Sequence, residues 1–100
     1  MPNYQSESID RLFVAISKLN SLEECRAFFD DLCTIKELQD MSQRFDAAIL
    51  LSEGKNYLEI TKAIGISTAT ISRVGRCLNY GSGGYKKAIE SIKEANNADK

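Results

Sequence analysis

Apolar residues recur at intervals of three and four positions along most of the chain. β-Branched residues do not alternate with polar ones over any useful length, so the pattern predicts helices and no strands. A first helix is predicted over residues 6–19, and a second helix begins after Ser21. Their apolar stripes are Ile9, Leu12, Phe13, Ile16 and Leu19 in the first, and Leu22, Cys25, Phe28, Phe29 and Leu32 in the second.

Specific residues mark three helix starts and one helix end. A short polar residue followed three positions later by glutamate predicts a capping box, in which each residue satisfies a free backbone amide of the other. Such pairs are Ser21 with Glu24, Thr34 with Glu37, and Asn56 with Glu59. The second pair predicts a third helix that runs to about residue 53, and Gly54 is well placed to end it.

Residues 55–80 have the pattern of a helix-turn-helix, in which a tight turn joins two short helices that cross. The fourth helix is predicted to end near residue 64. Gly65 then provides the positive φ of the turn without a Cβ penalty, and Ser67 or Thr68 caps a fifth helix that runs to about Leu78. Thr61 is expected where the two helices approach closely. The apolar residues expected to face each other are Ile60, Ile64, Ile66, Ile71 and Val74.

The remainder of the chain reads as a glycine-rich connection and a last helix. Residues 79–84 are predicted to be flexible. A helix over residues 84–95 carries Tyr85, Ala88, Ile89 and Ile92 on one side, and residues 96–100 are polar and expected to fray. At 100 residues the chain is predicted to be a single domain.

Charge is distributed unevenly, although the net charge is only −1. Residues 1–54 hold ten acids and five bases. Residues 55–87 hold six bases against Glu59 alone, which makes the segment that contains the helix-turn-helix basic. Because the attraction of phosphate falls off over about 8–10 Å at physiological salt, this local balance matters more than the net charge.

The helix-turn-helix and its charge together predict binding to the major groove of double-stranded DNA. Short hydroxyl and methyl side chains would let the fifth helix lie deep in the groove and contact base edges. The expected outer face of that helix is Ser67, Thr68, Ala69, Thr70, Ser72, Arg73 and Arg76. Residues expected to hold the DNA backbone or lie beside it are Lys55, Asn56, Tyr57, Lys62, Arg76, Lys86 and Lys87.

Other function classes find little support in the residues. The chain has no histidine, no glycine-rich phosphate loop after a strand, and no cysteine with a plausible base partner, so no catalytic residues are expected and an enzyme is not predicted. Cys25, Cys33 and Cys77 lack metal-ligand spacing and read as reduced thiols, most simply as small core residues. No apolar run is long enough to span a membrane, and the N-terminus is unlike a secretion signal, so a cytoplasmic location is expected.

The segment from residue 34 to residue 79 resembles the Trp repressor superfamily, and in particular its Trp-repressor-related YerC/YecD branch. The stretch that carries the resemblance ends in Ala69-Thr70-Ile71-Ser72-Arg73-Val74-Gly75-Arg76-Cys77-Leu78-Asn79-Tyr80-Gly81. The resemblance implies an all-α, six-helix protomer and an intertwined homodimer. Residues 1–54 and the last helix, 84–95, would form the dimer. It also implies a transcriptional regulator, expected to act as a repressor.

The resemblance further implies an effector pocket. Thr34, Arg44, Thr70 and Arg73 stand where the repressor places contacts to its ligand. Val74 stands where the repressor has a glycine beside the indole, and Cys77 stands where it has a serine near the amino group. A valine would overfill a slot sized for a flat ring, so tryptophan is not expected as corepressor and no cofactor is predicted. Arg44 and Arg73 have a plainer interpretation, as surface ion pairs or phosphate contacts.

A second function class fits the same helices. A helical, dimeric interaction module could bind a protein partner without binding DNA in a sequence-specific way. The salt dependence of binding to random duplex DNA distinguishes the two function classes, because a protein that neutralises phosphates loses affinity steeply as salt rises.

Overall fold

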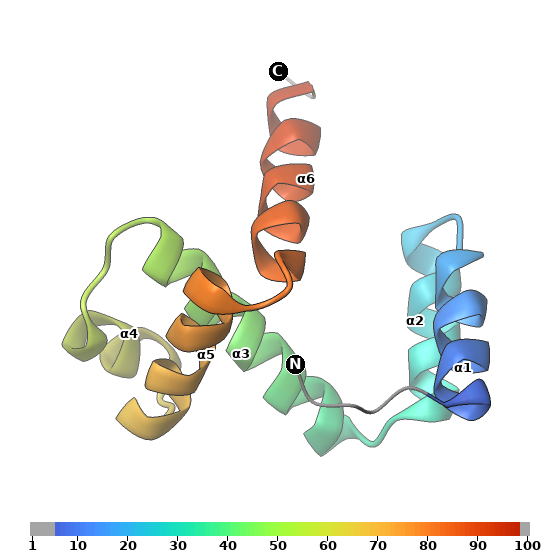
Figure 1. The fold of residues 1–100 in the computed structure, drawn as a ribbon, viewed down its shortest axis with the longest axis horizontal. Helices are drawn as coiled ribbons and strands as arrows, with labels where there is room; N and C mark the ends of the chain where they lie inside the picture. The colour runs from blue at the N-terminus through green and yellow to red at the C-terminus, as the bar shows by residue number, and fades with distance from the viewer. Residues whose placement is uncertain (1–5, 99–100) are drawn as a thin grey trace. The chain divides into compact units, whose positions relative to one another are not determined.

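The computed structural model describes residues 6–98, and within this range all regular structure is helical. Its helices are α1 (Glu7–Ser17), α2 (Leu22–Leu32), α3 (Ile35–Ser52), α4 (Tyr57–Ile64), α5 (Thr68–Tyr80) and α6 (Gly84–Ala98), as drawn in Figure 1. The predicted all-α, six-helix protomer is therefore confirmed. None of the helices in the described residues combines the length and apolarity needed to cross a bilayer.

The chain divides into two compact units, Met1–Leu38 and Gln39–Lys100, with the division falling near the start of α3. In the first unit, α1 and α2 begin at serine N-caps. The amide of Ile9 donates to Ser6 Oγ at 3.1 Å, and that of Glu24 donates to Ser21 Oγ at 3.0 Å. The Glu24 carboxylate accepts from the amide of Asn20 rather than from that of Ser21. The capping box predicted for Ser21 and Glu24 thus closes one residue earlier than expected, at Asn20.

The first unit has no core of its own in its described residues, 6–38, because none of them is buried. Large apolar side chains stay open instead, with Phe13 50% exposed, Leu22 67% and Leu32 48%. The rings of Phe28 and Phe29 form an edge-to-face pair with centroids 5.6 Å apart. These two helices are amphipathic and leave much of their apolar surface uncovered.

The start of α3 shows the predicted capping box in full. The amide of Thr34 donates to Glu37 Oε1 at 2.8 Å, and the amide of Glu37 donates to Thr34 Oγ1 at 3.1 Å. The hydrogen bonds from the Thr34 backbone and side chain lower the pKa of Glu37 below its ordinary value of 4.5. At the other end of the helix, Gly54 has φ +85° and its amide donates to Leu51, which confirms its predicted role.

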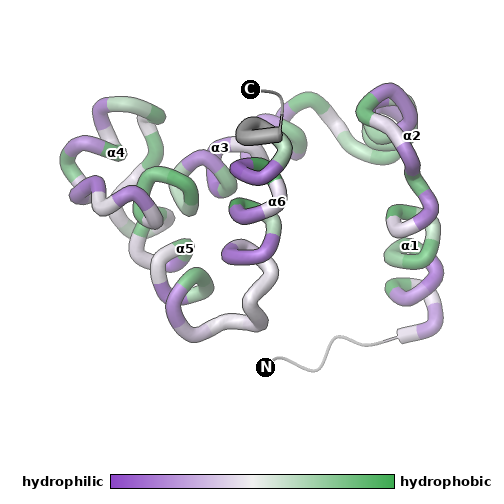
Figure 2. The backbone as a smooth tube through the Cα atoms, turned by 90° about the horizontal axis from the view of Figure 1, so that it is seen from above, coloured by the Kyte–Doolittle hydropathy of each residue, from purple (hydrophilic) through white to green (hydrophobic). Residues whose placement is uncertain are grey.

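The second unit has a compact core to which all four of its helices contribute. The buried residues are Ala47 and Ala48 of α3, Ile60 of α4, Ile71, Val74 and Leu78 of α5, and Ile89 of α6. Half-buried apolar side chains surround them, and Phe45 stacks on Tyr85 with ring centroids 6.4 Å apart. Hydrophobic and hydrophilic residues alternate along each of these helices in Figure 2, as expected where one face packs and the other meets solvent.

Three predicted helix ends are wrong by two or three residues. α1 ends at Ser17, because the amides of Lys18 and Leu19 donate to oxygens three residues back and tighten the chain. α5 continues to Tyr80, so Asn79 and Tyr80 are helical rather than part of the flexible connection. α6 continues to Ala98, through the first part of the tail expected to fray, and residues 99–100 lie outside the described residues.

Candidate nucleic-acid interface

The helix-turn-helix begins at a capping box between Asn56 and Glu59. The amide of Glu59 donates to Asn56 Oδ1 at 2.8 Å, and the amide of Asn56 donates to Glu59 Oε1 at 3.0 Å. This fixes the first turn of α4 and confirms the predicted pair. Glu59, the one acid of residues 55–87, is therefore engaged in holding α4.

Gly65 makes the turn between the two helices. Its φ is +83° and its amide donates to the Thr61 carbonyl at 2.8 Å, which ends α4. A Cβ built at this glycine meets no atom within 4 Å, so the requirement for glycine is the backbone conformation and not lack of space. Both features confirm the predicted role of Gly65.

The facing sides of α4 and α5 are apolar, as predicted. Ile60 and Ile71 are fully buried and Val74 is nearly so, while Ile64 and Ile66 are half-buried around them. Thr61 also lies on this side, and its Oγ1 is buried without a hydrogen-bond partner in the described part of the chain. A hydroxyl in that position is costly, because a buried polar group that loses water must find another partner.

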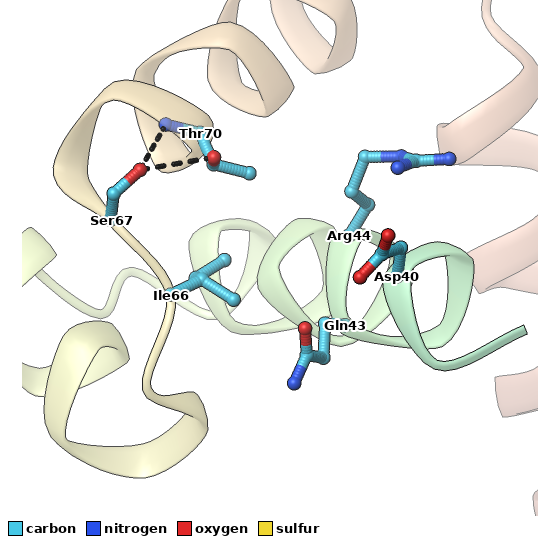
Figure 3. A pocket seen from close by; sticks show the side chains of 6 residues that line it. All are labelled: Asp40, Gln43, Arg44, Ile66, Ser67 and Thr70. Carbon is cyan, nitrogen blue, oxygen red and sulfur yellow. Dashed lines mark hydrogen bonds between the residues drawn. The ribbon is translucent and has the colours of Figure 1, made fainter. Parts of the chain in front are cut away.

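The N-terminus of α5 is capped by Ser67. The amide of Thr70 donates to Ser67 Oγ at 3.2 Å, and the two hydroxyl oxygens lie 3.0 Å apart (Figure 3). Thr70 is half-buried, as is Ser72. These two residues are thus less accessible than the uniformly exposed outer face that was predicted.

The rest of the predicted outer face is open to solvent. Thr68, Ala69, Arg73 and Arg76 of α5 are exposed, and the helix carries no acid. The exposed residues predicted to lie against the DNA backbone are Lys55, Asn56, Tyr57, Lys62, Lys86 and Lys87. Exposed cations thus lie before α4, on α4, on α5 and on α6, and the exposed short side chains lie on α5.

Tyr57, Ser72 and Arg76 line one hollow of about 370 Å³, together with Asn79 and Tyr80 of the last turn of α5. Tyr57 packs toward α5, since its Oη would lie 3.8 Å from a Cβ placed on Gly75. Asn79 and Tyr80 were missed as members of this surface because their sequence reads as a connection. The signal available in the sequence was the aromatic residue at position 80, next to the predicted fifth helix. The structure leaves the Tyr80 side chain 86% exposed.

Four of the predicted effector-pocket residues come together. Arg44, Arg73, Val74 and Cys77 line a hollow of about 330 Å³. Tyr85 completes its wall, and sequence reasoning assigned it only to the apolar side of the last helix. Its stacking on Phe45 joins residues forty positions apart in the sequence, which no local pattern could indicate.

The other two predicted pocket residues are not among those that line this hollow. Thr70 lines a separate hollow of about 290 Å³ with Ile66, Ser67 and residues of α3, shown in Figure 3. The α3 residues there are Asp40, Gln43 and Arg44. Thr34 caps α3 in the first unit, and its part in a pocket stays a prediction. Cys77 is exposed rather than a core residue, and no group of acids, cysteines or histidines in the described residues could hold a metal ion.

Comparison with known proteins identifies the family. The family model described as Trp repressor protein matches residues 7–93. The uncharacterized protein YerC of Bacillus subtilis (strain 168) is 51% identical over 90 residues, which cover 90% of this chain and 86% of YerC.

Two crystal structures have the same fold. A TrpR-like protein from Eubacterium eligens superposes with a TM-score of 0.84 at 46% identity, covering 89% of this chain and 92% of the other. A protein from Staphylococcus aureus, described as a candidate Trp repressor, gives a TM-score of 0.83 at 43% identity and covers 89% of each chain. With a family match over most of its length and a relative at this level of identity, the chain belongs to the Trp repressor family.

Proposed function

We propose that the protein is a sequence-specific DNA-binding transcriptional regulator that acts as a repressor, with α5 as its recognition helix. The observation that carries the proposal is the geometry of α5. Its N-terminal turn is capped and exposed, it bears no acid, and Arg73 and Arg76 follow on its open side. A helix of this kind fits the major groove, where its first residues contact base edges.

The proposed phosphate contacts come from cations that flank the recognition helix. Lys55 precedes α4, Lys62 lies in its last turn, and Arg76 lies on α5, all with exposed side chains. Such contacts set the register of the protein on the duplex and do not read sequence. Specificity therefore depends on the side chains at the start of α5.

We propose that the working form is a homodimer. The first unit supports this, because its helices have no buried residue in the described range and leave Phe13 and Leu22 at least half exposed. In the proposed dimer, residues 1–54 and 84–95 provide the contacts, and the whole chain acts as one domain around residues 55–80. Two recognition helices would then meet half-sites one DNA turn apart, roughly 34–36 Å.

We further propose that tryptophan is not the corepressor. Val74 lines the hollow beside Arg44 and Arg73 and is only 2% exposed, so its methyl groups are fixed in the wall. Making room for an indole would cost about 1–3 kcal/mol through displaced neighbours. Titration calorimetry with tryptophan should give no micromolar binding, and micromolar binding would refute this part of the proposal.

The proposed role is regulatory rather than enzymatic, as for the Trp repressor family, and it requires the protein to share a compartment with DNA. The expected cytoplasmic location follows from that role and remains a prediction.

The test is selection of bound duplexes from a random library, followed by affinity measurements on a selected duplex. The double variant Lys62→Ala/Arg76→Ala should bind it at least tenfold more weakly. Arg11→Ala/Lys18→Ala removes the same charges from exposed positions of the first unit. When sedimentation shows this control to be as dimeric as the wild type, it should bind as the wild type does. Failure to enrich any sequence, with binding instead to a protein partner, would favour the interaction-module reading.

A further inference from the structure

The first turn of α5 presents an unusual set of groups to a major groove. Ser67 and Thr70 bind each other through their hydroxyls at 3.0 Å, and the serine oxygen also accepts the Thr70 amide. Between them, Thr68 and Ala69 are exposed. The exposed groups of this turn therefore include the γ-methyl and the hydroxyl of Thr68 and the β-methyl of Ala69.

This turn also lacks the side chains that identify bases by paired hydrogen bonds. Residues 67–72 read Ser-Thr-Ala-Thr-Ile-Ser, without arginine, lysine, asparagine, glutamine or an acid. Arginine or lysine on guanine and asparagine or glutamine on adenine are the usual bidentate readers. The first residue of α5 able to do this is Arg73, which lines the hollow formed with Val74 and Tyr85.

A methyl group can distinguish one base by apolar contact. Thymine carries a 5-methyl group in the major groove, and none of the other three bases has a methyl group at that edge. Each methyl pair that leaves water stabilises the complex in proportion to the apolar area removed. An exposed methyl surface at the tip of a recognition helix is thus complementary to thymine.

We infer that Thr68 and Ala69 select the half-site by contact with thymine 5-methyl groups, and that hydrogen bonds to base edges from this turn contribute little selectivity. This inference rests on the proposed DNA binding and names the base feature that the same surface reads. The selected half-site should contain one or two thymines whose methyl groups face the start of α5.

The test replaces thymine with uracil in a duplex selected from the random library. Uracil keeps every donor and acceptor of thymine and lacks only the methyl group. Replacement at each half-site thymine in turn should weaken binding about fourfold at one or two positions, the factor expected for burial of one methyl group. Replacement in the flanking sequence should have no effect.

Matched variants assign the contact to its atoms. Thr68→Ser removes the methyl and keeps the hydroxyl, whereas Thr68→Val removes the hydroxyl and keeps the branched shape. The serine variant should bind the thymine duplex about fourfold more weakly and lose its sensitivity to uracil at one position. The valine variant should retain both affinity and sensitivity. Ala69→Gly, checked for folding by thermal melting, should lose sensitivity at a neighbouring position.

The outcomes separate this inference from the proposed function. If the protein enriches a duplex but uracil has no effect at any half-site position, the inference fails and DNA binding stands. The reverse variant pattern, with Thr68→Val weak and Thr68→Ser intact, would assign recognition to the hydroxyl and also overturn it. If no duplex is enriched, both fail.

Discussion

The hydroxyl groups of Ser67 and Thr70 lie 3.0 Å apart at the start of α5, and the Thr70 amide donates to the same serine oxygen at 3.2 Å. The Ser67 side chain thus satisfies one of the free backbone amides at the start of α5 and also holds the neighbouring Thr70 hydroxyl in place. The turn that carries Thr68 and Ala69 is ordered by this contact, which links the local stability of α5 to what it presents to a ligand.

Ser67→Ala removes the cap and should lower the free energy of unfolding by about 0.5–2 kcal/mol. Ser67→Asp keeps a capping oxygen and should retain stability, but its carboxylate would lie beside the proposed phosphate contacts. Urea unfolding should therefore separate the alanine variant from wild type, while DNA affinity should separate both variants from wild type. An aspartate variant that binds duplex DNA as well as wild type would contradict this placement of the helix start.

Gly65 and Gly75 should respond in opposite directions to the same substitution. Gly65 has φ +83°, so Gly65→Ala is expected to cost about 1–2 kcal/mol through backbone strain alone. Gly75 lies inside α5, and a Cβ there would meet Leu51 Cδ1 at 3.6 Å and Tyr57 Oη at 3.8 Å, which are ordinary contacts. Gly75→Ala should stabilise the protein by about 0.5–1 kcal/mol. Denaturation midpoints that move the same way for both would refute this account.

The buried hydroxyl of Thr61 predicts a stabilising substitution. Thr61→Val has nearly the same shape and removes the unpartnered Oγ1, so the variant should be about 1 kcal/mol more stable. Thr61→Ser keeps the hydroxyl and should give no gain. The check is thermal unfolding of both variants, and a valine variant less stable than wild type would mean that the hydroxyl has a partner in solution.

The proposed dimer predicts that exposed apolar residues differ in their importance. Phe13 of α1 is 50% exposed and Leu58 of α4 is 64% exposed in the single chain. If a second copy covers the first unit, Phe13→Ser should cost about 2 kcal/mol or more and shift sedimentation toward the monomer. Leu58→Ser should change stability by no more than about 0.5 kcal/mol and leave the oligomer intact. Equal, small effects at both positions would argue against the dimer contacts proposed here.

Helix starts could be predicted well because their signals are local. A glutamate three residues after Ser21, Thr34 and Asn56 indicates that each of these residues caps a helix. The conformational freedom of Gly65 indicates the turn. Helix ends were predicted less well. The sequence around Tyr80 does not distinguish a last helical turn from a connection. In the structure the amide of Gly81 donates to the Cys77 carbonyl, and this hydrogen bond extends the helix to Tyr80.

In the candidate site, too, the features set by local pattern could be predicted, whereas those set by side-chain rotamers or tertiary packing could not. The exposed positions of α5 follow from helical periodicity, so Thr68, Ala69, Arg73 and Arg76 could be assigned from the sequence. The hydrogen bond between Ser67 and Thr70 depends on side-chain rotamers, which the sequence pattern does not contain. Tyr85 joins the hollow through tertiary packing on Phe45, and that contact cannot be read from residues of either helix alone.

The salt dependence of binding to duplex DNA tests the central claim most directly. A dimer that places Lys55, Lys62 and Arg76 of each copy on phosphates makes six such contacts, so the logarithm of the affinity should fall against the logarithm of salt with a slope of about −5. The double variant Lys62→Ala/Arg76→Ala should reduce this slope to about −2. A slope near zero for the wild type, or one that the double variant leaves unchanged, would contradict DNA binding through this surface.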